Sequence, residues 1–225
     1  MSYTTIKLAD DLWAIEEGFV RAFLLHGGKG SLLIDACMSG GDELRETVLS
    51  ITGGVRPTMT VTHTDGDHIG GFNENDTVFI HPTEFYHLGD HRFNVLSLWE
   101  TDSFQAGNRN LRVRLIPGHT PGSIALIDYE AKMIFIGDSV SDSHVFMFGN
   151  GRNIDAYIES LTMLKTEFGG YGFYACHGTT VLPPSALDKQ LECALKVRTG
   201  EITGEEAPHM KGCKLYSYNG AALLY

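Results

Sequence analysis

The chain has 225 residues, of which 43% are hydrophobic, and its formal net charge is −11. A chain of this length and composition can bury one substantial core, so we expect a single domain spanning residues 1–225. Phosphate backbones are held by clustered Lys and Arg, so the acidic balance argues against a nucleic-acid partner. Apolar runs such as Ala221 to Tyr225 are far shorter than the ~20 residues needed to cross a bilayer, which argues against a membrane partner.

The cellular location and the cysteine chemistry follow from two further patterns. The stretch from Met1 to Ile6 lacks the charged and apolar regions of a secretory signal, so we expect a cytoplasmic protein. No Cys-x-x-Cys spacing occurs, which argues against a zinc knuckle or a disulfide framework. We therefore expect buried free thiols at all four cysteines, namely Cys37, Cys176, Cys193 and Cys213.

Hydrophobic periodicity predicts a strand-rich first half followed by a second half with the same rhythm. The first half contains a helical pattern over 42–51 and these expected strands: 4–8, 12–17, 20–26, 31–35 and 59–62. The second half contains expected helices at 154–167 and 184–197, and these expected strands: 112–116, 123–128, 132–136, 173–176, 213–218 and 221–224. The last two strands should form a hairpin around Asn219-Gly220. Helices outside two sheets are the expected architecture.

The run His63-Thr64-Asp65-Gly66-Asp67-His68, directly after an apolar stretch, places four metal-competent side chains within six residues. Imidazole nitrogens and carboxylate oxygens are ligands for divalent Zn, Fe and Mn, and a strand that enters a Gly-containing loop can turn them toward one point. The alternative is a polar turn with capping Asp residues.

Three more polar residues, His119, Asp138 and His177, each follow an apolar run. Each pattern indicates a strand that ends and presents one side chain to a loop. A single His at a strand end is usually structural. Four such strand ends along one chain, including the end before His63, favour a common site.

These motifs resemble the metallo-β-lactamase-fold hydrolases, whose pattern is His-x-His-x-Asp-His followed by a lone His, a lone Asp and a last His. Flanking residues also match, namely Thr62, Gly70-Gly71, Pro117-Gly118-His119-Thr120 and Gly137-Asp138. The resemblance implies an α/β fold with a four-layer αββα sandwich. It also implies two metal ions. His63, Asp65 and His119 would hold the first metal, and Asp67, His68 and His177 would hold the second. Asp138 would bridge the two.

The chain departs from this family at Asp65, where the family has its second histidine. A carboxylate is a harder ligand than an imidazole, so the departure favours iron or manganese over an all-zinc site. The extra negative charge should leave the metal's water less acidic. Because Asp is shorter than His, Asp65 has two options, direct ligation or contact through a water, and the second would weaken the first site.

The activity implied by the resemblance is hydrolysis by a metal-bound hydroxide, acting on a small ester, thioester, lactone or phosphoester. Asp67 and His144 are the expected catalytic side chains, with His144 as the general acid. The segments 81–104 and 139–152 are expected to line a partly apolar pocket. The first segment is expected to form either a helical cap over this pocket or a helix packed in the core.

Two alternatives stay open. A di-iron redox protein related to the metal domain of flavodiiron oxygen and nitric-oxide reductases is favoured by a carboxylate at Asp65, and it would need a separate electron donor. A catalytically weak small-molecule-binding regulator is the other. The sequence identifies neither the substrate nor the oligomeric state.

Overall fold

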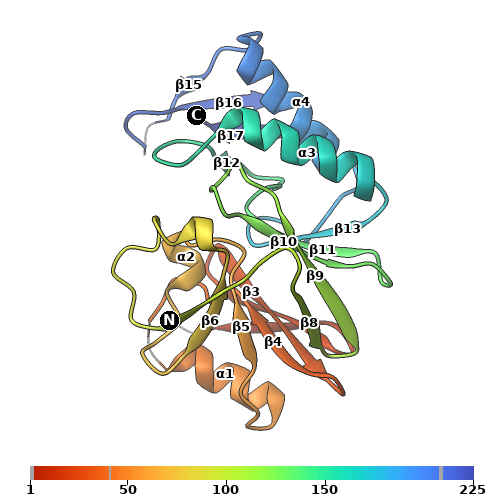
Figure 1. Cartoon of the computed structure of the whole chain (residues 1–225). Helices are drawn as coiled ribbons and strands as arrows, with labels where there is room; N and C mark the ends of the chain where they lie inside the picture. The colour runs from red at the N-terminus through yellow and green to blue at the C-terminus, as the bar shows by residue number, and fades with distance from the viewer. Residues whose placement is uncertain (1–2, 41, 208–209) are drawn as a thin grey trace. The chain divides into compact units, whose positions relative to one another are not determined.

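The computed structural model describes residues 3–40, 42–207 and 210–225 (Figure 1). Their contacts group the chain into two compact units. The N-terminal unit comprises the residues up to Arg114 together with Leu126–Ala131, and the C-terminal unit comprises Leu115–Ala125 and Lys132–Tyr225.

A sheet of seven strands, among the residues described, forms the framework of the N-terminal unit, and its strands follow one another in chain order. Neighbours are antiparallel from β1 to β4 and parallel from β4 to β7. The bounds are β1 Thr4–Ala9, β2 Leu12–Glu17, β3 Val20–Gly27, β4 Gly30–Ile34, β5 Thr58–Thr60, β6 Thr77–Ile80 and β7 Asn94–Ser97. In the parallel part, β4, β5 and β6 end at the same edge, and polar residues that follow strands gather at such an edge.

Helix α1 (Glu43–Thr52) packs on this sheet through its apolar face. Leu44 and Val48, four residues apart, are buried in one cluster with Leu33 and Val78 of the sheet. The helix ends at Gly53, whose φ of 63° is a left-handed conformation that favours glycine. The helix predicted over 42–51 is thus confirmed.

The segment after β6 corrects one expectation. Neither a helical cap nor a long core helix forms over 81–104: the chain makes a three-residue 3₁₀ helix, η1 (Pro82–Glu84), and then β7 and β8 (Ser103–Ala106). The apolar residues of this segment alternate or cluster without a sustained helical repeat, and parallel pairing of β7 with β6 decides the outcome. Strand β8 then pairs antiparallel with β9 (Arg109–Leu115).

The C-terminal unit contains two groups of strands and two helices. Strand β11 (Met133–Gly137) is parallel to β13 (Gly172–Ala175), which pairs antiparallel with β14 (Val181–Leu182). A second sheet has the order β12, β17, β16, β15, with bounds Val145–Phe146, Ala221–Leu224, Lys214–Tyr218 and Glu205–Glu206. Residues of β10 (Ile124–Asp128) belong to both units.

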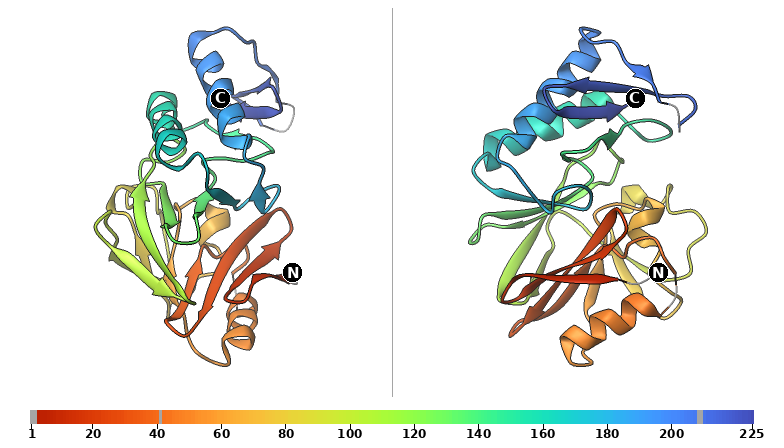
Figure 2. Two further views of the ribbon diagram at one scale, coloured as in Figure 1. Left: turned by 90° about the vertical axis from the view of Figure 1, so that its right-hand side faces the viewer. Right: turned by 180° about the vertical axis from the view of Figure 1, so that it is seen from behind.

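Helices α3 (Ile154–Phe168) and α4 (Ala186–Thr199) lie side by side, and α4 packs on the hairpin of β16 and β17 (Figure 2). Asn153 caps α3, because its side-chain oxygen accepts hydrogen bonds from the amides of Asp155 and Ala156. The hairpin turns at Asn219 and Gly220, whose φ values of 52° and 83° are typical of a two-residue turn. These elements confirm the corresponding predictions.

All four cysteines are buried free thiols, as predicted. Burial, together with the charges of Glu17 and Asp35, raises the pKa of the Cys37 thiol to about 12, which keeps it protonated at neutral pH. In the described part of the chain, every helix is too short or too polar to cross a membrane.

Candidate metal centre

The motif His63 to His68 follows β5 and enters α2 (Gly66–Ile69), a single helical turn. His63 and His68 are buried, and their ring centroids lie 4.0 Å apart. Burial of two adjacent imidazoles is uncommon unless both are oriented toward partners. The N-terminal unit thus presents a pair of fixed histidines.

The two acidic residues of the motif face these histidines. Asp65 occupies the N-cap position of α2, yet its side chain makes no capping hydrogen bond. Its Oδ2 lies 3.6 Å from Nε2 of His63, and Oδ1 of Asp67 lies 3.9 Å from Nε2 of His68. The capping interpretation of this turn is therefore wrong for Asp65.

Two glycines let α2 lie directly on the segment that follows β4. A Cβ at Gly70 would lie 2.0 Å from the carbonyl oxygen of Met38, and one at Gly71 would lie 2.3 Å from that of Ala36. The Ala36 amide donates to the carbonyl of His68, and the Gly71 amide donates to that of Ala36. Close backbone contact thus fixes the end of the motif.

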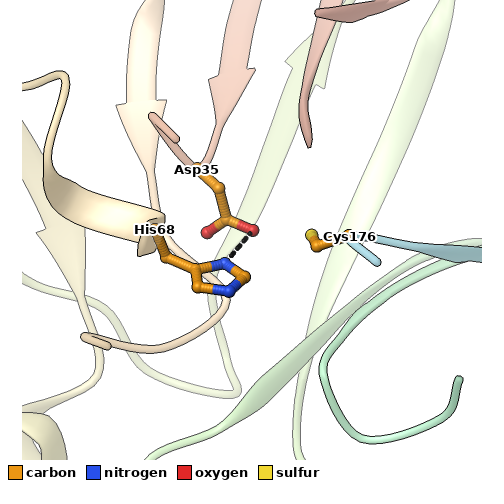
Figure 3. A group of neighbouring side chains, drawn as sticks. All are labelled: Asp35, His68 and Cys176. Atoms are coloured by element: carbon orange, nitrogen blue, oxygen red, sulfur yellow. Dashed lines mark ion pairs between the residues drawn. The ribbon is translucent and has the colours of Figure 1, made fainter. Parts of the chain in front are cut away.

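Asp35, which the sequence analysis placed in a strand and gave no role, organises the motif. It is fully buried, and its carboxylate accepts hydrogen bonds from the amide of Thr62 at 2.7 Å and from its hydroxyl at 2.9 Å. The same carboxylate lies 3.1 Å from Nδ1 of His68 (Figure 3). The sequence pattern could have indicated Asp35 as a site residue, because it follows an apolar run, as Asp138 does.

Glu84, on η1, is a second buried carboxylate that the sequence analysis did not identify. It is fully buried and accepts hydrogen bonds from the amide of Thr64 at 2.8 Å and from its hydroxyl at 2.7 Å. At the start of η1, Nδ1 of His81 accepts from the Thr83 amide. Burial lowers the pKa of His81, against the opposing charges of Glu100 and Glu84, and this favours the neutral ring that such a cap requires.

In the C-terminal unit, His119 lies in a loop that α3 holds. The carbonyl oxygen of Phe146 lies 2.7 Å from Nδ1 of His119, and Arg152 donates to the His119 carbonyl at 2.6 Å. A Cβ at Gly118, whose φ is +142°, would lie 2.4 Å from Cα of Tyr157. The loop therefore needs glycine before the histidine.

Asp138 and His177 follow the parallel strands β11 and β13. Oδ2 of Asp138 lies 3.2 Å from Nε2 of His177 and 3.8 Å from Nε2 of His119. Tyr157, fully buried, donates from its hydroxyl to the carbonyl of Ser139 at 2.7 Å. Burial and the charges of Cys193 and Asp138 raise the pKa of Tyr157 well above its usual value, which keeps this donor protonated.

The other nominated residues differ in their surroundings. His144 is exposed in the loop before β12, and its Nδ1 lies 3.3 Å from the Ser143 hydroxyl. Cys176, next to His177, is buried, as predicted, and lies just after the end of β13. The general-acid role of His144 stays a prediction.

Within each unit the predicted ligands therefore lie together. His63, Asp65, Asp67 and His68 form one group, and His119, Asp138 and His177 form the other. Two atoms that each lie about 2.1 Å from one tetrahedral ion are about 3.4 Å apart. The four imidazole to carboxylate distances range from 3.2 to 3.9 Å and bracket that value.

Second contacts of the histidines agree with metal ligation. A metal-binding imidazole usually gives its other nitrogen to a carboxylate, hydroxyl or carbonyl partner, which fixes the ring. Nδ1 of His68, His63 and His119 lies near Asp35, the Thr62 hydroxyl and the Phe146 carbonyl, respectively. In all three, Nε2 faces an aspartate. The donor set fits a divalent cation.

Comparison with known families supports the same conclusion. Residues 15–202 match the model of the metallo-beta-lactamase superfamily. The chain belongs to this superfamily. Divalent metal binding is general in the metallo-beta-lactamase superfamily, and clusters of His and Asp among the described residues could hold such metals.

Curated relatives are named as hydrolases of this superfamily. The chain is 29% identical over 201 residues to the acyl-coenzyme A thioesterase MBLAC2 of Gallus gallus, covering 70% of this chain and 73% of that protein. It is 30% identical over 131 residues to a hydroxyacylglutathione hydrolase of Bdellovibrio bacteriovorus, covering 57% of this chain and 46% of that protein. These relatives confirm the prediction of a metal-dependent hydrolase.

A solved structure confirms the fold. The metallo-beta-lactamase from Pontibacter korlensis matches with a TM-score of 0.71 at 16% identity, covering 86% of this chain and 99% of that one. At this level of identity the likeness concerns the fold alone. The predicted α/β class of metallo-β-lactamase type is thus correct.

Proposed function

We propose that this metallo-beta-lactamase-superfamily hydrolase cleaves small thioesters at a binuclear metal centre. The observation that carries the metal centre is the orientation of His63, His68 and His119, whose Nδ1 atoms contact protein partners while Nε2 faces an aspartate. The thioester bond is proposed from the similarity to the acyl-coenzyme A thioesterase. Other small esters, lactones and phosphoesters are the broader class to which this proposal belongs.

We propose that residues 1–225 work as a single catalytic domain with the metal ligands that the family resemblance implies. His63, Asp65 and His119 are proposed to hold the first metal, and Asp67, His68 and His177 are proposed to hold the second. Asp138 is proposed to bridge the two. A cytoplasmic location and a small-molecule substrate complete the proposal.

When bound, divalent metals at such a centre activate water and polarise the carbonyl of the substrate. The chain's own residues prepare that chemistry. Asp35 contacts Thr62 and His68, and the Phe146 carbonyl contacts His119, so these side chains are already oriented by the protein. His144 is proposed to give a proton to the leaving group, and Asp67 is proposed to act at the second metal.

A metal analysis with an activity panel tests the proposal. The protein would be purified anaerobically without added metal, analysed for its elements, and assayed on acyl-coenzyme A thioesters, simple esters, lactones and phosphodiesters. Two metals per chain and preferential turnover of thioesters are expected. If the purified protein contains no metal, the proposed metal centre is wrong. Metal-loaded protein that hydrolyses no compound of the panel would favour the regulatory alternative.

Asp138→Ala tests the bridging assignment. Because the bridge would contribute to both sites, the variant should lose most of its metal and lower kcat/KM by about 100-fold or more. Metal content and thioester turnover measure both effects. Asp188→Ala is the control, since Asp188 is an exposed partner of Lys165 in the same unit. Full metal content in Asp138→Ala would refute the bridge.

One observation keeps iron as a candidate metal. The carboxylate of Asp65 faces His63 at 3.6 Å, and a carboxylate ligand favours iron or manganese over zinc. If the elemental analysis finds iron, turnover of oxygen or nitric oxide with an added electron donor would support the redox alternative. Iron-loaded protein that only hydrolyses thioesters would exclude it.

A further inference from the structure

Glu84 is a fully buried carboxylate in the N-terminal unit that the assignment of ligands does not use. A buried negative charge is costly unless hydrogen bonds compensate for it. Glu84 receives two of these from one residue, because Oε2 accepts from both the amide and the hydroxyl of Thr64, at 2.8 and 2.7 Å. Hydrogen bonds to an ionised acceptor are the stronger kind.

Thr64 lies between two proposed ligands of the first metal. Its amide belongs to the peptide bond that joins it to His63, and its carbonyl leads to Asp65. A hydrogen bond donated by this amide to Glu84 fixes the orientation of that peptide plane. On the other side of His63, Asp35 holds the amide of Thr62. The backbone that carries His63 is therefore held from both sides by buried carboxylates.

The segment that carries Glu84 has its own anchors, so the carboxylate is not needed to hold it. His81 caps η1 by accepting from the Thr83 amide, and the Leu88 amide donates to the Glu84 carbonyl. Leu88 is buried in the main cluster of the unit. The buried carboxylate thus serves the motif rather than its own helix.

We propose that Glu84 is a positioning residue for the metal centre. Through Thr64 it holds the motif in the conformation in which Nε2 of His63 and Oδ2 of Asp65 lie 3.6 Å apart, and it thereby raises the affinity for metal. The inference rests on the proposed function, because it requires His63 and Asp65 to bind metal. Residues that orient metal ligands typically contribute about 10- to 100-fold in affinity.

The test is metal affinity in the full-length apo protein, measured without any substrate. Cobalt(II) would be titrated into wild type, Glu84→Ala and Glu84→Gln, with visible absorption and chelator competition as the readouts. Glu84→Ala should weaken binding by about tenfold or more. The cobalt affinity of Glu84→Gln should lie between those of wild type and Glu84→Ala, because an amide oxygen still accepts both hydrogen bonds but carries no charge.

Asp76→Ala is the matched control. Asp76 is a buried carboxylate of the same unit that accepts from the Asn73 amide and pairs with Arg45. Its loss should lower the Tm of the apo protein and leave cobalt affinity within about twofold of wild type. Glu84→Ala with a similar loss of Tm but wild-type cobalt affinity would overturn the inference.

A second variant decides the matter if Glu84→Ala fails to fold. Thr64→Val removes the hydroxyl donor and keeps the amide and the side-chain shape, so it should weaken cobalt binding several-fold. Wild-type affinity in this variant would overturn the inference. Wild-type protein that binds no cobalt would refute the proposed function itself and the inference with it, so the two failures are distinguishable.

Discussion

Asp65 is the residue at which this chain departs from the motif that it resembles, and the structure places its side chain beside His63. The carboxylate makes no capping hydrogen bond to α2 and lies 3.6 Å from Nε2 of His63. Its side chain is 32% exposed, so an ion there would be in contact with solvent. The ligand preference of the first site should therefore depend on this one side chain.

We predict that Asp65→His shifts metal selectivity toward zinc. An imidazole replaces a hard anionic oxygen, and the remaining carboxylates then balance less of the metal charge. The measurement is the metal content of apo protein equilibrated anaerobically with equal concentrations of zinc, iron(II) and manganese. Asp10→His, at a fully exposed position, is the control. Unchanged selectivity would mean that Asp65 does not ligate the metal directly.

The residues of the site were predictable to the extent that each one ended an apolar run. His63, His119, Asp138 and His177 have that pattern, and the structure places them in the segments that follow β5, β9, β11 and β13, respectively. Asp35 has the pattern as well, but its role depends on the parallel pairing of β4 with β5, which brings it to Thr62. Glu84 has no such pattern, and the path of the chain after β6 alone brings it to Thr64.

At the scale of elements, α3 is the support for the His119 loop. The amide of Asn153 donates to the carbonyl of Gly118, and the Ser160 hydroxyl donates to that of Pro117. The backbone of Tyr157 fills the space beside Gly118. The helix is thus packed directly against the residue that precedes a proposed ligand.

Gly118→Ala should therefore disturb both stability and metal binding. The new Cβ would lie 2.4 to 2.6 Å from backbone and side-chain atoms of Tyr157, so α3 or the loop must shift. Such overpacking typically costs about 1–3 kcal/mol in the free energy of unfolding, in addition to the strain of a positive φ. Urea unfolding and metal titration would measure the two effects.

Gly149→Ala separates the two contributions to that loss. Gly149 also has a positive φ, +100°, but no atom lies within 4 Å of its would-be Cβ. In this variant the free energy of unfolding should fall only by the cost of backbone strain, and the metal affinity should stay unchanged. Equal losses in both variants would show that the contact with Tyr157 does not matter.

Local patterns predicted the regular elements well and the irregular ones badly. Helices α1, α3 and α4 and the closing hairpin were found within two residues of their predicted bounds, because each has an apolar face together with a capping residue or turn signal. The two-residue strands β12, β14 and β15 were not predicted, and neither were the four-residue strands β6, β7 and β8. The two-residue strands are too short to have a period, and only pairing with a neighbouring strand defines them.

For the whole molecule, the dependence of stability on pH follows from its buried carboxylates. Asp11, Arg109 and Asp128 form a buried ionic cluster in the N-terminal unit, with nitrogen to oxygen distances of 2.8 Å to Asp11 and 3.1 Å to Asp128. Burial opposes ionisation of Asp11, but hydrogen bonds from the Asn108 amide and from Arg109 outweigh it and lower its pKa. The folded protein therefore binds the proton of Asp11 less tightly than the unfolded chain does.

This difference fixes the direction of the pH effect. Because the folded pKa of Asp11 is lower, its contribution is fully present above the ordinary aspartate pKa of about 4 and is lost as the pH falls toward the folded value. Asp11→Asn should lower the free energy of unfolding by about 1.5–3 kcal/mol at pH 7, the usual size for a hydrogen bond to a charged group. The difference from wild type should shrink as the pH falls from 5 to 3.

Urea unfolding of metal-free protein at a series of pH values measures this difference, since a chelator removes the separate effect of metal release in acid. Asp10→Asn changes the neighbouring, fully exposed carboxylate and should follow the wild-type curve throughout. If the loss in Asp11→Asn stays constant between pH 7 and pH 3, the ionised form of Asp11 is not what stabilises the cluster. Its stabilising effect would then come from hydrogen-bond geometry that an amide cannot reproduce, and the acid sensitivity of the molecule would have its origin in other carboxylates.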